Sequence, residues 1–392
     1  MSEPTTTPGA DPATTRINRD ETEVGSVFVS NYPAYSFWDE EDVPKARQAL
    51  ASPPNPDSQL GLYLHIPFCR KRCKFCYFRV YTDKNADQIQ TYLDALAREV
   101  EHYAQQPAIQ GRPLHFVYFG GGTPSYISSR HLRALVERIK DVMPWDQADE
   151  IAFECEPGTL TKAKLETIRD IGVTRLSLGL ENLNDEILHH NGRAHVSKEI
   201  YQAMPWVKEL DFDQVNVDLI AGMVGETWER WRETVQKTID LDPDTVTVYQ
   251  MELPYNTVYS KDLLSGDSEA IPLADWKTKR AWHAYAFEQF AAAGYTRSSA
   301  YTMKKTPEAR FVYRDAVWTG QDMIGAGVAS FSHMNGVHYQ NAPRWEDYLG
   351  TIDRGDLPLH RAFATNRDEQ LIRELILQLK LGAIDPAYFR AK

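Results

Sequence analysis

Residues 63–78, which read YLHIPFCRKRCKFCYF, join a short β-rich run to a cluster of three cysteines. Cys69, Cys73 and Cys76 have the spacing Cys-x3-Cys-x2-Cys, and the remaining cysteine of the 392-residue chain is Cys155. Four basic residues stand between the first and third cysteines. Because a cysteine-poor chain gathers three of its cysteines in one short loop, the three are expected to share one chemical task.

Three interpretations of the cysteine cluster compete. The first residues, MSEPTTTPGADPATT, lack the charged and apolar regions of a secretory signal, so we expect a reducing cytoplasm, where disulfides are disfavoured. Structural zinc takes four ligands, usually in two pairs, and Cys155 stands far from the loop. A 4Fe-4S cluster normally takes four thiolates. Three thiolates would leave one iron of the cluster open to a substrate. The basic residues of the loop would offset the negative charge of the cluster and its thiolates.

The sequence on either side of the cysteines alternates between strands and helices. Strands are predicted at 62–67, 115–122, 150–157, 175–182, 214–223 and 245–254, and helices at 87–105, 129–142, 161–171, 197–209 and 227–240. Such alternation is typical of a parallel sheet. Six units predict an α/β fold, a partial (β/α)6 TIM-like barrel, rather than the eight units of a full barrel. Later helices at 275–294 and 368–382 predict a small, mostly helical C-terminal domain.

The strands have one apolar and one polar face. In RLSLGLE (175–181) the leucines alternate with Ser177, Gly179 and Glu181, and Glu154 and Asp218 stand at similar polar positions in their strands. Alternate residues of a strand share a face, and a dry barrel would carry Val, Ile and Leu inside. We therefore expect an interior that is lined for a ligand. For any single acid, a structural ion pair is the alternative.

The cysteine loop after a first strand, followed by YFGGGTPS at 118–125, resembles the radical S-adenosylmethionine (SAM) superfamily. Within it, the chain is similar to the oxygen-independent coproporphyrinogen III oxidase family, which includes haem chaperones and class C radical methylases. The resemblance runs from about residue 28 to the end. It implies that a 4Fe-4S cluster cleaves S-adenosyl-L-methionine reductively to a 5′-deoxyadenosyl radical, which takes hydrogen from a substrate.

The resemblance also implies a set of site residues. The cluster ligands would be Cys69, Cys73 and Cys76. The cofactor-binding residues would be Tyr63, Phe75, Gly120, Gly121, Gly122, Thr123, Glu154, Glu181, Arg193 and Asp218. Tyr63 and Glu181 would also act in catalysis. The family usually has glutamine where this chain has Glu181, and the exchange keeps the hydrogen-bond acceptor but adds a charge.

Three departures bear on which member of the family the chain resembles. Phe78 stands where the oxidases carry a further cysteine, and the region 312–327 keeps Trp318 of a haem-chaperone motif without its His-Asn pair. The stretch VFVSNYPAYSFW (27–38) is similar to a segment that covers the active site in oxidases and some methylases. We expect an enzyme that decarboxylates or methylates a porphyrin-type or other bulky conjugated substrate, with one or two S-adenosyl-L-methionine molecules. The alternative is a haem chaperone that uses His333, His338 or His360.

Partners and boundaries complete the expectations. A net charge of −12 with no long basic run argues against nucleic acid, and no apolar stretch is long enough to span a membrane. The resemblance implies a low-potential electron donor such as flavodoxin or ferredoxin. The predicted parts are a disordered tail (1–24), a covering segment with linker (25–60), a radical SAM core (61–300) and a C-terminal domain (301–392). In one interpretation the C-terminal domain is truncated.

Overall fold

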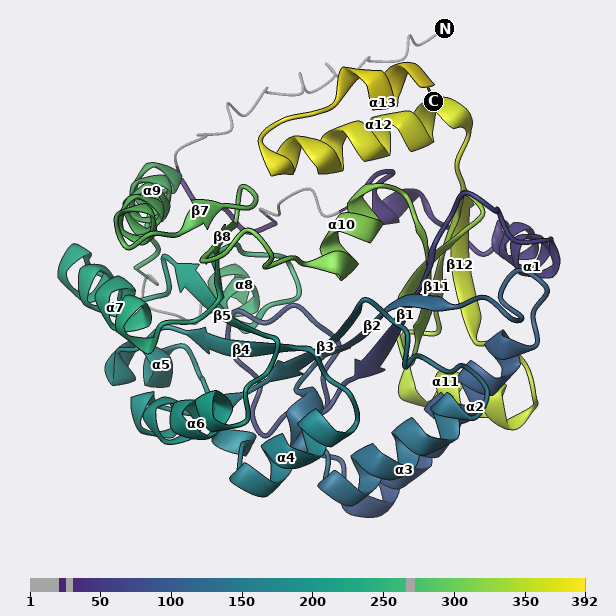
Figure 1. Ribbon diagram of the computed structural model, residues 1–392, viewed down its shortest axis with the longest axis horizontal. Coiled ribbons are helices and arrows are strands. Elements are labelled where there is room, and N and C mark those ends of the chain that lie inside the picture. The colour runs from purple at the N-terminus through teal and green to yellow at the C-terminus, as the bar shows by residue number, and fades with distance from the viewer. Residues whose placement is uncertain (1–20, 26–30, 266–271, 392) are drawn as a thin grey trace, which may run out of the picture.

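The computed structural model, shown in Figure 1, describes residues 21–25, 31–265 and 272–391. Within these ranges the strands form one sheet in the order β12-β11-β10-β9-β1-β2-β3-β4-β5-β6-β8-β7. The strands are β1 (Leu60–Ile66), β2 (Leu114–Gly121), β3 (Glu150–Cys155), β4 (Arg175–Glu181), β5 (Gln214–Ala221), β6 (Thr245–Gln250), β7 (Thr296–Arg297), β8 (Thr302–Lys304), β9 (Asp322–Ala326), β10 (Phe331–Met334), β11 (Val337–Asn341) and β12 (Leu359–Ala364). Residues 1–20 of the predicted tail (1–24) and residues 26–30 of the predicted covering segment (25–60) lie outside the described residues.

The helices lie mostly around the outer side of the sheet, and α10 (Val312–Trp318) lies within its curve (Figure 1). They are α1 (Val43–Ala51), α2 (Ala86–Ala104), α3 (Ser129–Lys140), α4 (Lys162–Asp170), α5 (Asp185–His190), α6 (Ser197–Glu209), α7 (Trp228–Leu241), α8 (Val258–Ser265), α9 (Trp276–Ala292), α10 (Val312–Trp318), α11 (Trp345–Asp353), α12 (Arg367–Gln378) and α13 (Pro386–Ala391). None of the helices in the described ranges is both long and apolar enough to cross a bilayer.

Strands β1 to β6 are parallel neighbours, which confirms the predicted α/β fold with a parallel sheet. The helices between them begin where the sequence offers caps. Asn85 accepts a hydrogen bond from the Gln88 backbone at 2.9 Å, and the Gln88 side chain accepts one from the Asn85 backbone at 3.1 Å. This capping box satisfies two backbone donors that the first turn of α2 would otherwise leave unpaired.

The two faces of the parallel strands differ as predicted. Leu176, Leu178 and Leu180 are fully buried or nearly so against the helices, within one continuous apolar core. The opposite face carries polar groups in register, since Glu154 of β3 lies beside Ser177 of β4. Burial of the apolar face contributes about 1.5–3 kcal/mol for each large side chain. The sheet therefore has a stable outer layer and leaves its inner face for a ligand.

The C-terminal part supplies strands as well as the expected helices. Strand β9 pairs in parallel with β1, with Leu60 opposite Asp322 and Leu64 opposite Ala326. Strands β10, β11 and β12 continue the sheet in antiparallel order. The glycine-rich and aromatic stretch 322–341 does not show the regular alternation of β1 to β6, so the sequence did not predict these strands. Helix α12 forms as predicted, and the predicted domain limits stay a prediction.

A buried carboxylate joins α2 to the C-terminal strands. Glu99 accepts hydrogen bonds from the backbone N–H of Gly327 at 2.7 Å, from the Asn341 amide at 2.6 Å and from the Tyr348 hydroxyl at 2.6 Å. Burial raises the pKa of Glu99 to about 7, and the three donors partly oppose that rise. This network fixes the turn after β9 against the helix that follows the cysteine loop.

Candidate active site

A cavity of about 500 Å³ lies at the carboxyl ends of the parallel strands. Twelve of the thirteen predicted site residues line it: Tyr63, Cys69, Cys73, Phe75, Cys76, Gly121, Gly122, Thr123, Glu154, Glu181, Arg193 and Asp218. Gly120 is not part of the lining. Gly120 lies behind the residues that line the cavity, and a Cβ atom on it would come within 2.8 Å of the Tyr118 ring. The fold therefore brings together residues that come from five strands and the loops after them.

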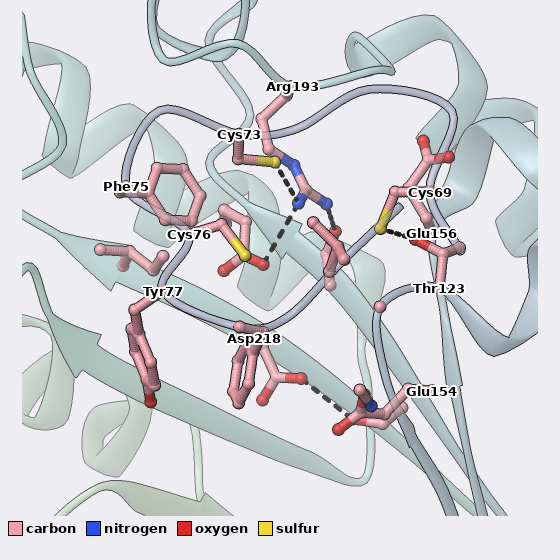
Figure 2. A pocket seen from close by; sticks show the side chains of 18 of the residues that line it. Cys69, Cys73, Phe75, Cys76, Tyr77, Thr123, Glu154, Glu156, Arg193 and Asp218 are labelled. Carbon is pink, nitrogen blue, oxygen red and sulfur yellow. Dashed lines mark hydrogen bonds and ion pairs between the residues drawn. The ribbon is translucent and has the colours of Figure 1, made fainter. Parts of the chain in front are cut away.

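The cysteine loop is closed at its base. The backbone N–H of Cys69 donates to the carbonyl of Tyr81 at 3.1 Å, and the N–H of Tyr81 donates to the carbonyl of Pro67 at 2.7 Å. The N–H of Cys76 donates to the carbonyl of Cys73 at 3.2 Å. These bonds turn the chain after β1 into a compact loop, and Figure 2 shows the three cysteine side chains around one shared space.

The thiols lie in surroundings that disfavour free thiolates. Burial raises the pKa of Cys69 to about 11 and that of Cys76 to about 12. Two donors nevertheless point at sulfur, since the Thr123 hydroxyl lies 3.3 Å from Cys69 Sγ and Arg193 Nη1 lies 3.4 Å from Cys73 Sγ (Figure 2). Thiols so placed ionise when a positively charged group binds them.

The glycines at the end of β2 allow two chain segments to approach closely. Gly121 has a φ of +111°, and a Cβ atom there would lie 2.5 Å from His65 Nδ1. A Cβ atom on Gly122 would lie 2.9 Å from the carbonyl oxygen of Phe68. The N–H of Thr123 donates to that same oxygen at 2.9 Å. Only glycine fits both positions without displacing the strand that leads into the cysteine loop.

Glu154 is a buried acid whose position is fixed by two donors. The Tyr118 hydroxyl donates to its Oε1 at 2.6 Å, and the Gly121 N–H donates to its Oε2 at 3.3 Å. Burial raises the pKa of Glu154 to about 7, the Tyr118 hydrogen bond lowers it, and the charge of Asp218 raises it. The carboxyl group is therefore close to half ionised near neutral pH, before any ligand enters the cavity.

Asp218 belongs to a hydrogen-bonded chain across the inner face of the sheet. Its carboxylate accepts from Ser177 Oγ at 2.9 Å and from Asn216 Nδ2 at 2.9 Å. The Asn216 carbonyl accepts in turn from the hydroxyls of Thr245 at 2.8 Å and Thr247 at 3.1 Å. This chain of hydrogen bonds orients the amide of Asn216. Burial raises the pKa of Asp218.

Glu181 and Arg193 form a buried pair beside the cysteine loop. The Glu181 Oε1 atom lies 3.7 Å from Arg193 Nη1, and Arg193 Nη2 donates to the carbonyl of Gly179 at 2.5 Å. Glu181 has a φ of +65° at an irregularity between β4 and β5. Burial raises its pKa to about 7, and the guanidinium opposes that rise. The glutamate in place of the family's usual glutamine thus has a positively charged partner.

The sequence analysis missed a second carboxylate centre. Glu156 Oε1 lies 2.9 Å from His195 Nδ1 and 3.3 Å from Arg70 Nη2, and it accepts the N–H of Gly158 at 3.0 Å. Arg70 also donates to the carbonyl of Ala194 at 2.7 Å. The centre ties the cysteine loop to the ends of β3 and α5. Its signals were Glu156, two residues after Glu154, and His195, two residues after Arg193.

Part of the cavity lining is aromatic and consists of Tyr63, Tyr118, Phe311 and Tyr313, which we call the aromatic wall. The rings of Tyr63 and Tyr118 stack with centroids 5.8 Å apart, and those of Tyr118 and Tyr313 are 4.3 Å apart. Glu150 holds the start of α10 by accepting the N–H of Tyr313 at 3.1 Å. Only Tyr63 was a predicted site residue, because nothing in the sequence around Tyr118, Phe311 or Tyr313 indicates that these side chains reach the cavity.

The three histidines of the chaperone alternative lie away from this cavity. His333 and His338 face each other across β10 and β11, with ring centroids 4.6 Å apart. His338 is 3% exposed and stacks on Trp38 at 5.3 Å. His360 lies nearer the surface, 3.5 Å from a carboxylate oxygen of Glu40. The described cavity lining includes none of the three.

Comparison with known proteins identifies the domain that carries this site. The profile of the Radical SAM superfamily matches residues 63–238, a range that holds the three cysteines, the glycines and both inner acids. Residues 63–238 are a Radical SAM domain. Radical SAM proteins use a 4Fe-4S cluster and S-adenosyl-L-methionine.

Proteins with two different names are among those similar to this chain. It is 28% identical to an oxygen-independent coproporphyrinogen III oxidase of Synechocystis over 90% of this chain and 78% of the relative. It is 26% identical to heme chaperone HemW of Bacillus subtilis, over 82% of this chain and 83% of the relative. Its fold matches coproporphyrinogen III oxidase of Escherichia coli with a TM-score of 0.77 and 24% identity, covering 92% of this chain and 87% of that one.

The residues present fit an iron–sulfur cluster and its cofactor. In the described ranges no three His, Cys, Asp or Glu side chains converge where one metal ion would sit, and the three thiols instead surround a space within the cavity. Arg193 Nε is buried there without a partner. A cluster would supply positive iron to the three thiols, and the pKa values of Cys69 and Cys76 are raised in its absence. The acids beyond it suit a ligand with an amino group and a sulfonium.

Proposed function

We propose that this protein is an enzyme that cleaves S-adenosyl-L-methionine reductively and uses the 5′-deoxyadenosyl radical to take hydrogen from a bulky, conjugated substrate. One observation carries the proposal. A single cavity is lined by the three thiols, by ionisable carboxyl groups and by the rings of the aromatic wall. In this proposal the thiols hold the cluster, the carboxyl groups face a cationic cofactor and the aromatic wall faces a flat substrate.

The cysteine loop holds the cluster in this proposal. Cys69, Cys73 and Cys76 supply the three thiolates, which leaves one iron for the amino and carboxylate groups of the cofactor. Thr123 donates to one sulfur and Arg193 to another, so both stabilise negative charge on the ligands. The cluster supplies the electron that breaks the sulfonium bond.

The residues between the cluster and the wall bind S-adenosyl-L-methionine. Backbone groups of 120–122 approach the methionine part because no side chain obstructs them. Glu154 and Asp218 offer carboxylates to the ammonium, the sulfonium or the ribose. Phe75 packs on the adenine, and Tyr63, whose hydroxyl lies 3.2 Å from His65 Nδ1, closes the side of the pocket. Dense hydrogen bonding fixes both carboxylates before the cofactor arrives.

The same arrangement leaves Glu181 and Arg193 for a polar part of the cofactor or for a second S-adenosyl-L-methionine. A second cofactor would make the reaction a methyl transfer. A single one would suit an oxidative decarboxylation of the coproporphyrinogen type, in which the substrate radical loses carbon dioxide and passes one electron to a one-electron acceptor. The aromatic wall presents ring faces to a conjugated substrate, for which offset stacking contributes about 0.5–1.5 kcal/mol per ring pair. The relatives named coproporphyrinogen III oxidase make coproporphyrinogen III the first substrate to test.

Product analysis tests the proposal. The cluster would be reconstituted without oxygen, and S-adenosyl-L-methionine, dithionite and coproporphyrinogen III would be added. 5′-Deoxyadenosine with loss of carbon dioxide from the porphyrinogen is expected for the decarboxylase, and 5′-deoxyadenosine with S-adenosylhomocysteine for the methylase. A protein with an intact cluster that yields neither product would overturn the proposal.

The second candidate function is that of a haem chaperone, which the Bacillus subtilis relative favours. Titration with haem separates the two, because a chaperone would give a stoichiometric shift of the Soret band. His360 is the most accessible of the three late histidines, whereas His333 and His338 are buried. A shift that His360→Ala abolishes, in a protein that does not cleave S-adenosyl-L-methionine, would favour the chaperone over the enzyme.

A further inference from the structure

The face of the sheet that carries the cavity continues beyond it into the C-terminal strands. Tyr63 of β1, which lines the cavity, lies beside Gly325 of β9. On the same strand, Met323 lies beside His333 of β10, and His333 lies beside His338 of β11. Residues paired in this way share one side of the sheet, as do residues two apart along a strand. His338 therefore shares the face of Tyr63, three strands away, or about 14 Å at the usual strand spacing.

Three side chains that can carry positive charge gather on this part of the face. We call Arg361, Arg373 and His338 the basic trio. The Trp38 ring stacks on His338 with centroids 5.3 Å apart and has its centre 6.0 Å from the Arg361 guanidinium. Burial lowers the pKa of His338, and the charges of His333 and Arg373 lower it further. The members of the trio therefore repel one another when they are charged.

Two members of the basic trio are buried and have polar atoms that lack a partner. Arg373 is 4% exposed and His338 is 3% exposed. Among the described residues, the Arg373 side chain makes one hydrogen bond, from Nε to Asn31 Oδ1 at 3.0 Å, and no ion pair. The His338 Nε2 atom is buried without a hydrogen-bond partner in the same part of the chain.

This arrangement leaves the Arg373 guanidinium without a paired carboxylate. Burial lowers the pKa of Arg373 to about 10, and the charge of Glu374 opposes that change only in part. Taking a charged group out of water costs free energy unless another polar group replaces the water, and buried polar groups in proteins nearly always have such a partner. The partner that Arg373 lacks is therefore expected to be an anion that does not belong to the chain.

Tyr35 lies close both to the basic trio and to the cavity. Its backbone carbonyl accepts a hydrogen bond from Arg361 Nη1 at 2.9 Å. Burial raises the pKa of Tyr313, a residue of the aromatic wall, and the proximity of Tyr35 contributes to that rise. The proximity of Tyr35 also opposes the lowering of the pKa that burial causes at Arg373. The basic trio is thus a neighbour of the cavity, with Tyr35 beside both.

We propose that the basic trio binds a carboxylate that a substrate in the cavity carries on a flexible arm. The inference rests on the proposed function, in which the ring system of that substrate packs on the aromatic wall. Glu154 and Asp218 inside the cavity repel a carboxylate, whereas the basic trio attracts one. The two outer nitrogens of Arg373 suit this ligand, because a guanidinium and a carboxylate form two parallel hydrogen bonds.

Two fluorescent probes that differ in one group test this site. Pyrenebutyrate carries a carboxylate and pyrenebutanol a hydroxyl, on the same ring system and an arm of the same length. The Kd of each is measured by fluorescence titration of the protein loaded with its iron–sulfur cluster. We expect the wild type to bind pyrenebutyrate about tenfold more tightly than pyrenebutanol, and Arg373→Gln to reduce that ratio to about twofold or less. Arg373→Lys keeps the charge without the paired donors and should retain part of the ratio.

The matched control is Arg112→Gln. The Arg112 side chain is 10% exposed, and its carboxylate partner, Asp322 at 3.0 Å, belongs to the chain. This variant should keep the wild-type ratio even if it is less stable. Each ratio compares two probes on one protein, so partial unfolding lowers both affinities alike and leaves the ratio unchanged.

Equal Kd values for the two probes in the wild type would overturn the site, as would a ratio that Arg373→Gln leaves unchanged or a wild type that binds neither probe. Butyrate is the arm without the ring, and its displacement of pyrenebutyrate at concentrations near the Kd of the probe would show a site for free anions and overturn the substrate arm. Binding needs no reductant. A wild type that shows the tenfold ratio but forms no 5′-deoxyadenosine with dithionite would therefore overturn the proposed function and leave the carboxylate site in place.

Discussion

Replacing Tyr118 with phenylalanine tests whether Glu154 binds the cofactor as a carboxylate. The Tyr118 hydroxyl donates to Glu154 at 2.6 Å, and this bond opposes the rise in pKa that burial causes. Tyr118→Phe removes the donor and keeps the ring in the aromatic wall. The pKa of Glu154, about 7 in the wild type, should therefore rise further.

The size of the effect follows from the strength of that bond. A hydrogen bond to a charged group contributes about 1.5–3 kcal/mol, and one pKa unit corresponds to about 1.36 kcal/mol, so the pKa of Glu154 should rise by about one to two units. At pH 7.5 the ionised fraction would fall from about three quarters to about a quarter or less. If the carboxylate form binds S-adenosyl-L-methionine, the Kd should weaken about three- to twenty-five-fold at that pH.

The assay is calorimetric titration of the cluster-loaded protein with S-adenosyl-L-methionine between pH 6.5 and 9. The raised pKa moves the required deprotonation to higher pH, so affinity lost at pH 7.5 should return toward pH 9. Tyr313→Phe is the control, because it removes a hydroxyl from the same aromatic wall that is not hydrogen-bonded to Glu154 in the described chain. Parallel pH profiles for wild type and Tyr118→Phe, or equal shifts in the two variants, would refute the reasoning.

Three further predictions concern the cluster, a buried carboxylate and a glycine. Cys73→Ala should lose the cluster absorbance and keep the fold, whereas Cys155→Ala, at a buried position in β3, should keep both. Glu99→Ala should lower the free energy of unfolding, measured in urea, by about 3–5 kcal/mol, because three buried donors lose their acceptor. The control is Glu101→Ala, which removes a partly exposed ion pair and should lower the free energy of unfolding by about 1 kcal/mol or less. Since the folded protein raises the pKa of Glu99 to about 7 from 4.5, this carboxyl group makes stability fall as pH rises between those values, and Glu99→Ala should make that fall shallower. Gly122→Ala should reduce the melting temperature and the iron content together, because its Cβ would press on backbone atoms before the cysteine loop, at a cost of about 1–3 kcal/mol; an unchanged iron content would count against that coupling.

The parallel strands could be predicted because their signal is local. All six begin within two residues of the predicted positions. Leu176, Leu178 and Leu180 are an example. They alternate strictly with polar residues, and such alternation over a stretch of this length predicts a half-buried β-strand. The Glu154 and Asp218 positions followed from the same alternation, and the cavity contains both. The cysteines and glycines were found through spacing, which also depends only on neighbouring residues.

The rest of the site depends on contacts between distant segments. Phe311 and Tyr313 reach the cavity because Glu150, more than 150 residues earlier in the chain, accepts backbone N–H groups at the start of α10. No local pattern in 305–320 indicates that docking. Strand β9 likewise becomes a strand beside β1, in a stretch whose glycines weaken any local preference. Residues of this kind are recognised only when the partner segment is known.

The pairing of β9 with β1 has a consequence for the order in which the protein matures. Strand β1 leads directly into the cysteine loop, yet one of its two neighbours in the sheet is made of residues 322–326. During synthesis, the strand that holds the future ligands has an open edge until most of the chain has left the ribosome. We expect iron–sulfur assembly to follow translation for this reason. A chain cut at residue 300 would keep every cysteine and still present an unpaired strand edge, so it should aggregate before it is loaded.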